Sequence, residues 1–112
     1  MAKSRRSCCP VACVLDMLGD KWTLLVVRDM AAGKQLFKEF MDLPERIASN
    51  ILADRLRRLV EMEWVVSKPH PDYPDRPMYS LTKSGRSVIS LLEAVADWGL
   101  KNIPGTAAKL RP

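Results

Sequence analysis

Residues Leu36 to Leu81 read LFKEFMDLPERIASNILADRLRRLVEMEWVVSKPHPDYPDRPMYSL, and this segment decides the fold. It opens with a short stretch, Leu36–Met41, whose apolar residues predict a brief helix, followed by a turn at residues 43–44. From Ala48–Ser49 to Glu61 the apolar residues recur every three or four positions, which predicts a second, amphipathic helix. The residues on its apolar face are Ala48, Ile51, Leu52, Leu56, Leu59 and Val60.

Two short β-prone stretches, Trp64–Lys68 and Met78–Leu81, follow the second helix. The nine residues between them, Pro69–Pro77, include four prolines and two aspartates. So many breakers exclude a helix or a central strand, and the pattern predicts a hairpin with a long loop. Helix, turn, basic helix and hairpin is the order of a winged helix-turn-helix, which places one helix in the DNA major groove and the hairpin, or wing, beside it. We therefore expect an α+β fold that is mainly α.

Further helices are expected on both sides of this segment. They are a first helix from Pro10 to the stop at Gly19, a second over Lys21–Ala32 capped by Asp20, and a last one over Lys83–Asn102 capped by Thr82. Residues 1–8 lack apolar periodicity and are expected to form a mobile basic arm. The pattern indicates one domain over residues 9–103 and a loose basic tail over residues 104–112.

Composition narrows the class of protein. The chain has 112 residues, of which 47% are hydrophobic, so a single small core is available. No apolar run approaches the roughly 18 residues that span a bilayer, and the first apolar run is broken by Asp16 and Asp20. A cytoplasmic protein without a membrane partner is expected. The net charge of +5 suits a polyanionic partner without identifying one.

The face of the second predicted helix opposite its apolar stripe carries polar and charged residues. Arginine can bind guanine or phosphate and asparagine can bind adenine, so this face is the candidate for contact with double-stranded DNA. The alternative is an ordinary solvated helix face. The carboxylate of Asp54 repels phosphate. It could instead accept a hydrogen bond from a cytosine amino group or hold a neighbouring arginine. The candidate DNA-contacting residues are Arg46, Ser49, Asn50, Ala53, Asp54, Arg57 and Arg58, with Lys68 and Arg76 from the wing.

The three cysteines, Cys8, Cys9 and Cys13, lie close together near the start of the sequence. Neither a complete disulfide set nor a zinc site is expected, because the number is odd and His70 is distant; no metal or other cofactor is predicted. Cys9 precedes Pro10 at a helix start, where N–H groups and nearby basic residues (Lys3, Arg5 and Arg6) stabilise a thiolate. The alternative is that all three are inert small residues.

Five motifs appear in order along the chain: Cys9–Pro10, Gly19–Leu25, Leu52–Leu59, Tyr79–Gly85 and Trp98–Gly99. Together they resemble those of the HxlR-type, MarR-like family of bacterial winged-helix transcription regulators. The resemblance covers about residues 9 to 99 and implies a cytoplasmic homodimer that binds roughly palindromic operators. It also implies that a cysteine at the position of Cys9 can sense electrophiles or oxidants, and that the first and last helices form the dimer interface. The interface residues that the resemblance implies are Val11, Val14, Leu91, Leu92, Val95 and Trp98.

The chain departs from the family pattern at two places. Glu63–Trp64 stands where the family usually has Gly-Leu, so the helix end loses a glycine suited to a left-handed backbone and the angle into the wing is expected to differ. Residues Arg46–Asn50 stand where the family's recognition helix often opens with Gly-Ile-Ser, which leaves the capping residue open.

The function expected from the sequence is that of a sequence-specific, DNA-binding transcription regulator and not an enzyme. Two rivals remain at this level. The first is a protein-interaction module that uses the winged helix for protein contacts. A steep salt dependence of DNA affinity would distinguish a DNA-binding regulator from this rival, because phosphate contacts release counterions. A thiol enzyme built on Cys9 is the weaker rival, because the sequence identifies no partner base for the thiol.

Overall fold

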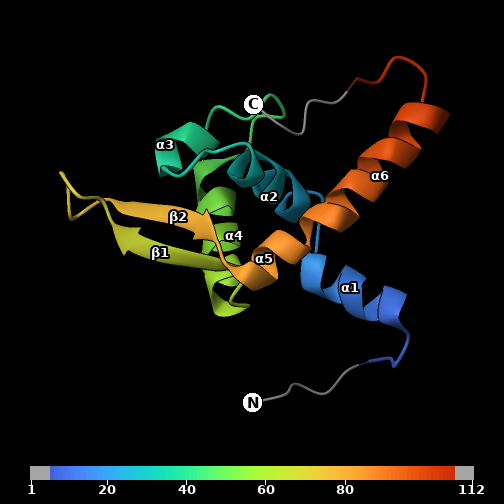
Figure 1. Ribbon diagram of the computed structural model, residues 1–112, viewed down its shortest axis with the longest axis horizontal. Helices are drawn as coiled ribbons and strands as arrows, with labels where there is room; N and C mark the ends of the chain where they lie inside the picture. Colours follow the sequence, from blue (N-terminus) through green and yellow to red (C-terminus); the bar gives the residue numbers. More distant parts are fainter. Residues whose placement is uncertain (1–5, 108–112) are drawn as a thin grey trace.

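A computed structural model of the protein describes residues 6–107 and confirms a mainly helical winged helix-turn-helix. The parts of the predicted arm and tail at residues 1–5 and 108–112 lie outside the described residues. In Figure 1, α2, α3 and α4 form a central body, the hairpin extends to one side, and α1 and α6 project to the other. The elements are α1 (Pro10–Leu18), α2 (Thr23–Ala31), α3 (Phe37–Phe40), α4 (Ser49–Glu61), β1 (Val65–Pro69), β2 (Pro77–Leu81), α5 (Lys83–Ser87) and α6 (Ile89–Asn102).

The core lies where α2, α3 and α4 meet the base of the hairpin. Leu52, Leu56 and Leu59 are almost fully buried, which confirms the centre of the apolar stripe predicted for α4. Ile51 and Val60 are half-buried, and Ala48, at the helix start, is exposed. The three leucines pack in one cluster with Val26 of α2 and Phe40 of α3. Burial of this stripe fixes the rotation of α4 about its axis, and the opposite stripe is therefore turned to solvent.

The hairpin is antiparallel and tied to the helical body. Val65 pairs with Leu81 at its base, and Pro69 pairs with Pro77 at its outer end, so each strand reaches one residue further toward the loop than the sequence predicted. The Tyr79 backbone N–H donates to the carbonyl of Gln35, between α2 and α3, over 2.8 Å. The Tyr79 ring also meets Phe40 edge to face, with ring centroids 6.5 Å apart. The wing thus starts from a fixed position beside α3.

Glu63, which replaces the glycine of the family pattern, keeps the left-handed backbone, with φ of 62°. The Trp64 N–H reaches back to the Leu59 carbonyl over 3.1 Å, which closes α4 as a glycine-ended helix would. The start of α5 packs closely against the backbone of Glu63 and Trp64. Thr82 donates its hydroxyl to the Glu63 carbonyl over 2.6 Å, and a Cβ on Gly85 would lie 1.9 Å from the Trp64 carbonyl oxygen.

The predicted last helix is two helices, so the expectation of one continuous helix over Lys83–Asn102 is wrong. Thr82 caps α5 as predicted, but the chain turns at Val88 before α6 begins. Around this break the hydroxyls of Ser87 and Ser90 donate to the carbonyls of Ser84 and Ser87. Such side-chain bonds compete with the helical ladder and bend helices.

The boundaries of α1 and α4 are those predicted, while those of α2 and α3 differ from the predicted ones by one or two residues. The capping role of Asp20 is confirmed, because its carboxylate accepts the N–H groups of Trp22 and Thr23 over 3.0 and 3.1 Å. In residues 6–107, no helix has the combination of length and hydropathy that crossing a bilayer requires.

Candidate nucleic-acid interface

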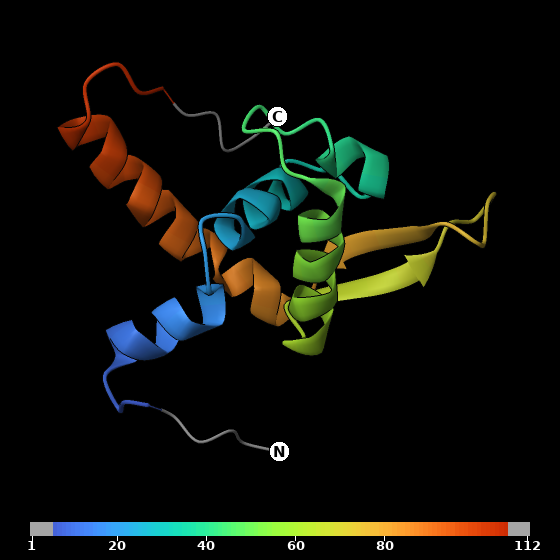
Figure 2. The ribbon, with the colours of Figure 1, turned by 180° about the vertical axis from the view of Figure 1, so that it is seen from behind.

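The face of α4 opposite its apolar stripe carries Ser49, Asn50, Ala53, Asp54 and Arg57 and is called the outward stripe. The outward stripe and the wing lie on the same side of the molecule. Figure 2 shows α4 at the front with the hairpin extending beside it. Ser49, Asn50, Ala53 and Arg57 are exposed, as the sequence predicted for a helix face turned away from the core. Helix period places Asn50, Asp54 and Arg57 in one line along this face. The face can therefore enter a groove without disturbing the core.

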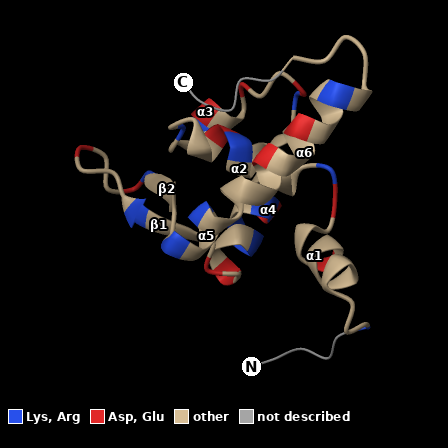
Figure 3. Cartoon of the chain, turned by 45° about the vertical axis from the view of Figure 1, so that its right-hand side comes forward, with Lys and Arg blue, Asp and Glu red and all other residues tan. Residues whose placement is uncertain are grey.

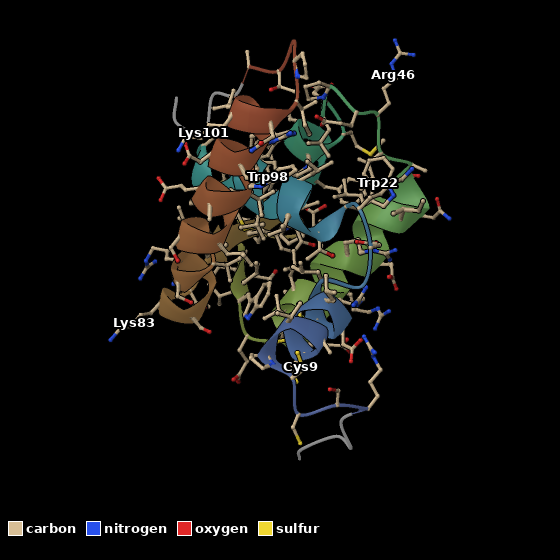
Figure 4. All side chains as sticks on the ribbon, turned by 90° about the vertical axis from the view of Figure 1, so that its right-hand side faces the viewer. Cys9, Trp22, Arg46, Lys83, Trp98 and Lys101 are labelled. Carbon is tan, nitrogen blue, oxygen red and sulfur yellow. The ribbon has the colours of Figure 1, made fainter. Side chains whose placement is uncertain are left out.

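The turn before α4 is held by an ion pair and by an unusual backbone. Arg28 of α2 donates to both carboxylate oxygens of Glu45, over 2.9 and 3.0 Å, and this bond holds the pKa of Glu45 below its ordinary value. Arg46 adopts a left-handed backbone with φ of 58°. Its side chain is exposed and points away from the helices in Figure 4. A cation is thus presented just before the N-terminus of α4.

The charged residues along α4 are paired with one another. Arg57 donates to Asp54, three residues earlier, and to Glu61, four residues later, over 3.1 Å in the second case. Asp54 also accepts from Arg55, which in turn donates to Asp20 at the start of α2. The alternative role predicted for Asp54, that of holding a neighbouring arginine, is confirmed by these contacts.

These pairs change the proton affinities of their members. The hydrogen bond from Arg57 holds the pKa of Asp54 below its ordinary value, and Asp54 correspondingly raises the pKa of Arg57. Partial burial alone would raise the pKa of Asp20, but the N–H groups of Trp22 and Thr23 together with Arg55 lower it. The carboxylates of Asp20 and Asp54 therefore stay ionised at neutral pH.

Arg58, which the sequence grouped with the DNA-contacting residues, is turned toward the junction of α1 and α2. Its guanidinium lies against Gly19, where a Cβ would be 2.6 Å from Nη2, and it donates to the Met17 carbonyl over 3.4 Å. Arg58 lies to one side of the outward stripe because it is one residue, about 100°, beyond Arg57. The structure does not bring it together with the other candidates on α4.

The wing carries a small organised cluster at its tip. Lys68 is exposed on β1, and the Arg76 guanidinium lies over the Tyr73 ring, 4.8 Å from its centroid. His70 Nδ1 accepts the N–H groups of Asp72 and Tyr73 over 3.0 and 3.2 Å. This acceptor role depends on the shape of the loop, and the sequence did not predict it.

Charge is unevenly distributed over the elements. Figure 3 shows lysine and arginine on the hairpin side of the molecule, including β1 and α4, while α1 is mostly free of charged residues. Acidic residues are interspersed on α4, α6 and the hairpin tip. The surface is therefore one of mixed charge rather than a continuous basic patch.

Cys9 lies at the N-terminus of α1 and is exposed, as predicted (Figure 4). Its N–H donates to the Ser7 hydroxyl over 3.0 Å, and the Cys13 thiol donates to the Ser7 carbonyl over 3.4 Å. Arg6 pairs with Asp16 at 2.7 Å, so its charge is directed to a carboxylate on α1. Lys3 and Arg5 lie outside the described residues. Cys8, Cys9 and Cys13 are all free thiols, and residues 6–107 hold no metal-ligand cluster.

The terminal helices carry a large exposed apolar surface. Val11 is 65% exposed, Val95 52% and Trp98 64%, while Val14 and Leu91 are half-buried. Leu92 is wrong as an interface residue, because it is 6% exposed and already buried inside the chain on a helix that packs against α2. Sequence reasoning missed four exposed apolar residues on or beside the same helices, which their helical spacing alone could have indicated: Leu15, Met17, Leu100 and Ile103.

A model of the HxlR-like helix-turn-helix family matches residues 17–107, which include the whole helix-turn-helix and wing. The chain belongs to the HxlR-like helix-turn-helix family. It is accordingly a transcriptional regulator with a helix-turn-helix domain.

Individual relatives agree with the family match. An uncharacterised HTH-type transcriptional regulator of Methanothermobacter thermautotrophicus is 33% identical over 91 residues, which cover 81% of this chain and 70% of the relative. The crystal structure of PA1607, a candidate transcription factor, has a TM-score of 0.81 and 38% identity, covering 94% of this chain and 74% of that one. The redox regulator HypR in its reduced form has a TM-score of 0.77 and 30% identity, covering 86% and 95%.

Proposed function

We propose that this HxlR-like protein is a homodimeric, sequence-specific DNA-binding regulator in which α4 enters the major groove. The observation that carries the proposal is the exposed outward stripe of α4 beside a wing anchored to the helical body. Helix α4 supplies base-directed groups in Ser49 and Asn50, while Arg46, Lys68 and Arg76 supply cations around them. Phosphate contacts from such cations fix register, and base contacts provide discrimination.

The test begins with selection of DNA fragments by the purified protein and sequencing of those retained. A common, roughly palindromic sequence is expected. Its affinity should then be measured over a range of salt concentrations, because each phosphate that a protein cation neutralises releases counterions and steepens the dependence on salt. Absence of enrichment, together with salt-independent binding, would reject DNA reading and favour the protein-interaction module.

Dimerisation is proposed through α1 and α6. Their exposed valine and tryptophan side chains form apolar surface that a single chain leaves in water. Burial of such surface between two copies is favourable, and a two-fold axis would place two α4 helices for two half-sites of one operator.

Regulation by oxidants or electrophiles is proposed at Cys9. The support is its exposure at the N-terminus of a helix and the likeness of the chain to HypR, which is named a redox regulator. The three cysteines of the sequence lie within residues 8–13. A disulfide would therefore join two cysteines of one α1 region or link the two α1 regions of a dimer. Either product would change how α1 meets its partner.

The measurement for Cys9 is DNA affinity before and after treatment with diamide, which removes two electrons and two protons from a pair of thiols. Wild-type protein should change its affinity and recover it with excess reducing thiol. Cys9→Ser should not respond, while Cys8→Ser serves as the matched control and should respond. An unchanged response in Cys9→Ser would assign sensing to another group.

A further inference from the structure

We propose that Asp54 is a specificity-determining residue that restrains Arg57 within the protein and weakens binding to non-cognate DNA. This inference rests on the proposed DNA binding by α4. It builds on one of the roles expected for Asp54, the hold on a neighbouring arginine, and adds a consequence for DNA specificity that requires no contact between the carboxylate and a base. The role follows from the pairing of the charged groups along the outward stripe.

The geometry of α4 leaves Arg57 occupied. Asp54 and Glu61 lie one turn before and one turn after Arg57, on the same face of the helix. The two terminal nitrogens of the guanidinium are both engaged, Nη2 with Asp54 and Nη1 with Glu61. A phosphate that approached Arg57 would have to displace a carboxylate or share the guanidinium with it.

Asp54 is itself held in place from the other side. Its second oxygen accepts from Arg55, whose Nε donates to Asp20. Asp20 is fixed in turn by the N–H groups at the start of α2. The Asp54 carboxylate is thus part of a chain of contacts that begins in the helical body, and these contacts favour its orientation beside Arg57.

The charges along this chain do not favour phosphate. Asp20, Asp54 and Glu61 contribute three negative charges, and Arg55 and Arg57 contribute two positive charges, so the network carries −1. Arg58, whose guanidinium donates to a backbone carbonyl rather than to a carboxylate, brings this sum to zero. The middle of α4 therefore offers a randomly placed DNA backbone no net attraction. Net attraction to DNA has to come from other cations, such as Arg46 and the wing.

Discrimination follows because specificity is a difference between affinities. In random DNA, binding by Arg57 requires the loss of existing ion pairs and brings Asp54 near phosphate. At a cognate site, the N–H groups of Arg57 that are not bonded to Asp54 or Glu61 are held in one orientation, about two turns from Asn50. A base edge in the right position gains from this orientation, whereas a misplaced phosphate does not.

The test is a set of binding titrations of Asp54→Asn against cognate and random duplexes at several salt concentrations. Removal of the carboxylate should tighten binding to random DNA about two- to fivefold, because surface charge interactions are of modest size. The dependence on salt should steepen by about one unit of logarithmic slope as Arg57 becomes available to phosphate. Affinity for the cognate duplex should rise less, so the cognate-to-random ratio falls.

Two further variants make the result specific. Asp97→Asn removes the same charge from an exposed helical ion pair with Lys101 on α6, remote from α4, and should leave both affinities unchanged. In the double variant Asp54→Asn/Arg57→Ala, the gain on random DNA should disappear. Thermal unfolding of each variant establishes that it is folded, and Asp54→Ala replaces Asp54→Asn if the latter is not.

Several outcomes would overturn the inference. One is an affinity of Asp54→Asn for random DNA that equals the affinity of the wild type. The proposed function would stand in that case if the wild type still showed a salt-dependent preference for cognate DNA. A fall in cognate affinity alone would show that Asp54 contacts a base directly. If the wild type binds no DNA, the proposed function fails and the inference fails with it.

Discussion

At the scale of single residues, exposure does not equal availability. Asn50 is exposed on α4 and makes no hydrogen bond through its side chain to any other described residue, whereas the equally exposed Arg57 is engaged by two carboxylates. An amide in that situation can give its whole hydrogen-bonding capacity to an adenine edge. Arg76 is intermediate, because its guanidinium rests on an aromatic ring and keeps its donors.

These differences predict distinct effects for two substitutions. Asn50→Ala should cost about 1–3 kcal/mol on the cognate duplex and relax the preference at one position in each half-site. Arg76→Ala should weaken binding to cognate and random duplexes alike and lower the salt slope by about one. Titrations against cognate, single-substituted and random duplexes separate the two. Unchanged base preference in Asn50→Ala would mean that another face of α4 lies in the groove.

A backbone effect is predicted at Glu63. Its left-handed conformation costs a residue with a Cβ about 1 kcal/mol, so Glu63→Gly should raise the free energy of unfolding by about 0.5–1 kcal/mol. Met62, one residue earlier, has an ordinary helical backbone, and Met62→Gly should lower stability. Urea unfolding of both variants gives the comparison, and a loss of stability in Glu63→Gly would contradict the prediction.

At the scale of helices and strands, the sequence predicted elements that depend on local chemistry. The apolar stripe of α4, the caps at Asp20 and Thr82, and the proline-rich wing loop each have their cause within a few residues. The break at Val88 and the orientation of Arg58 depend on neighbours distant in the chain or on competing hydroxyls, which periodicity does not encode. For the same reason, the sequence could not show that Leu92 is buried while other apolar residues of α6, which packs against α2, are exposed.

The junction of α1, α2 and α4 should lose stability in acid. The folded-state pKa of Asp20 is below its ordinary value of 3.8, so its contribution to stability is present above that value and is lost as the pH falls through the lower, folded-state pKa. Wild-type protein should therefore lose more unfolding free energy between about pH 5 and about pH 3 than Asp20→Asn does. Unfolding by urea over this range measures it, and parallel pH profiles would show that Asp20 contributes no such linkage.

At the scale of the whole molecule, the shape suggests a unit that is completed by a second copy. The radius of gyration is 14.8 Å. A compact chain of this length would have about 13 Å. The excess reflects the projection of α1, α6 and the wing from the central body (Figures 1 and 2). Of these projections, α1 and α6 carry the exposed apolar side chains.

The corresponding prediction concerns Trp98. Substitution Trp98→Asp should convert a dimer at micromolar concentration into a monomer. The proposed interface buries this exposed aromatic side chain, and its loss costs about 2 kcal/mol or more at each of two symmetric positions. Lys101→Ala, on the same helix, should leave the dimer intact. Light scattering gives the mass of each variant. A wild-type protein that is monomeric at this concentration would refute the proposed interface.

The absence of any buried residue in α1, an element wholly within the described residues, has a consequence for the lifetime of the protein. A nine-residue helix that is at most half-buried, as Leu18 is against the core, lacks the burial that makes a helix of this length stable in water. If a second copy supplies that burial, the folding of α1 depends on protein concentration. A scarce protein would then expose an unfolded segment to cellular proteases, and an abundant one would protect it. Degradation would fall as the protein accumulates, so its abundance would respond to its rate of synthesis more than proportionally.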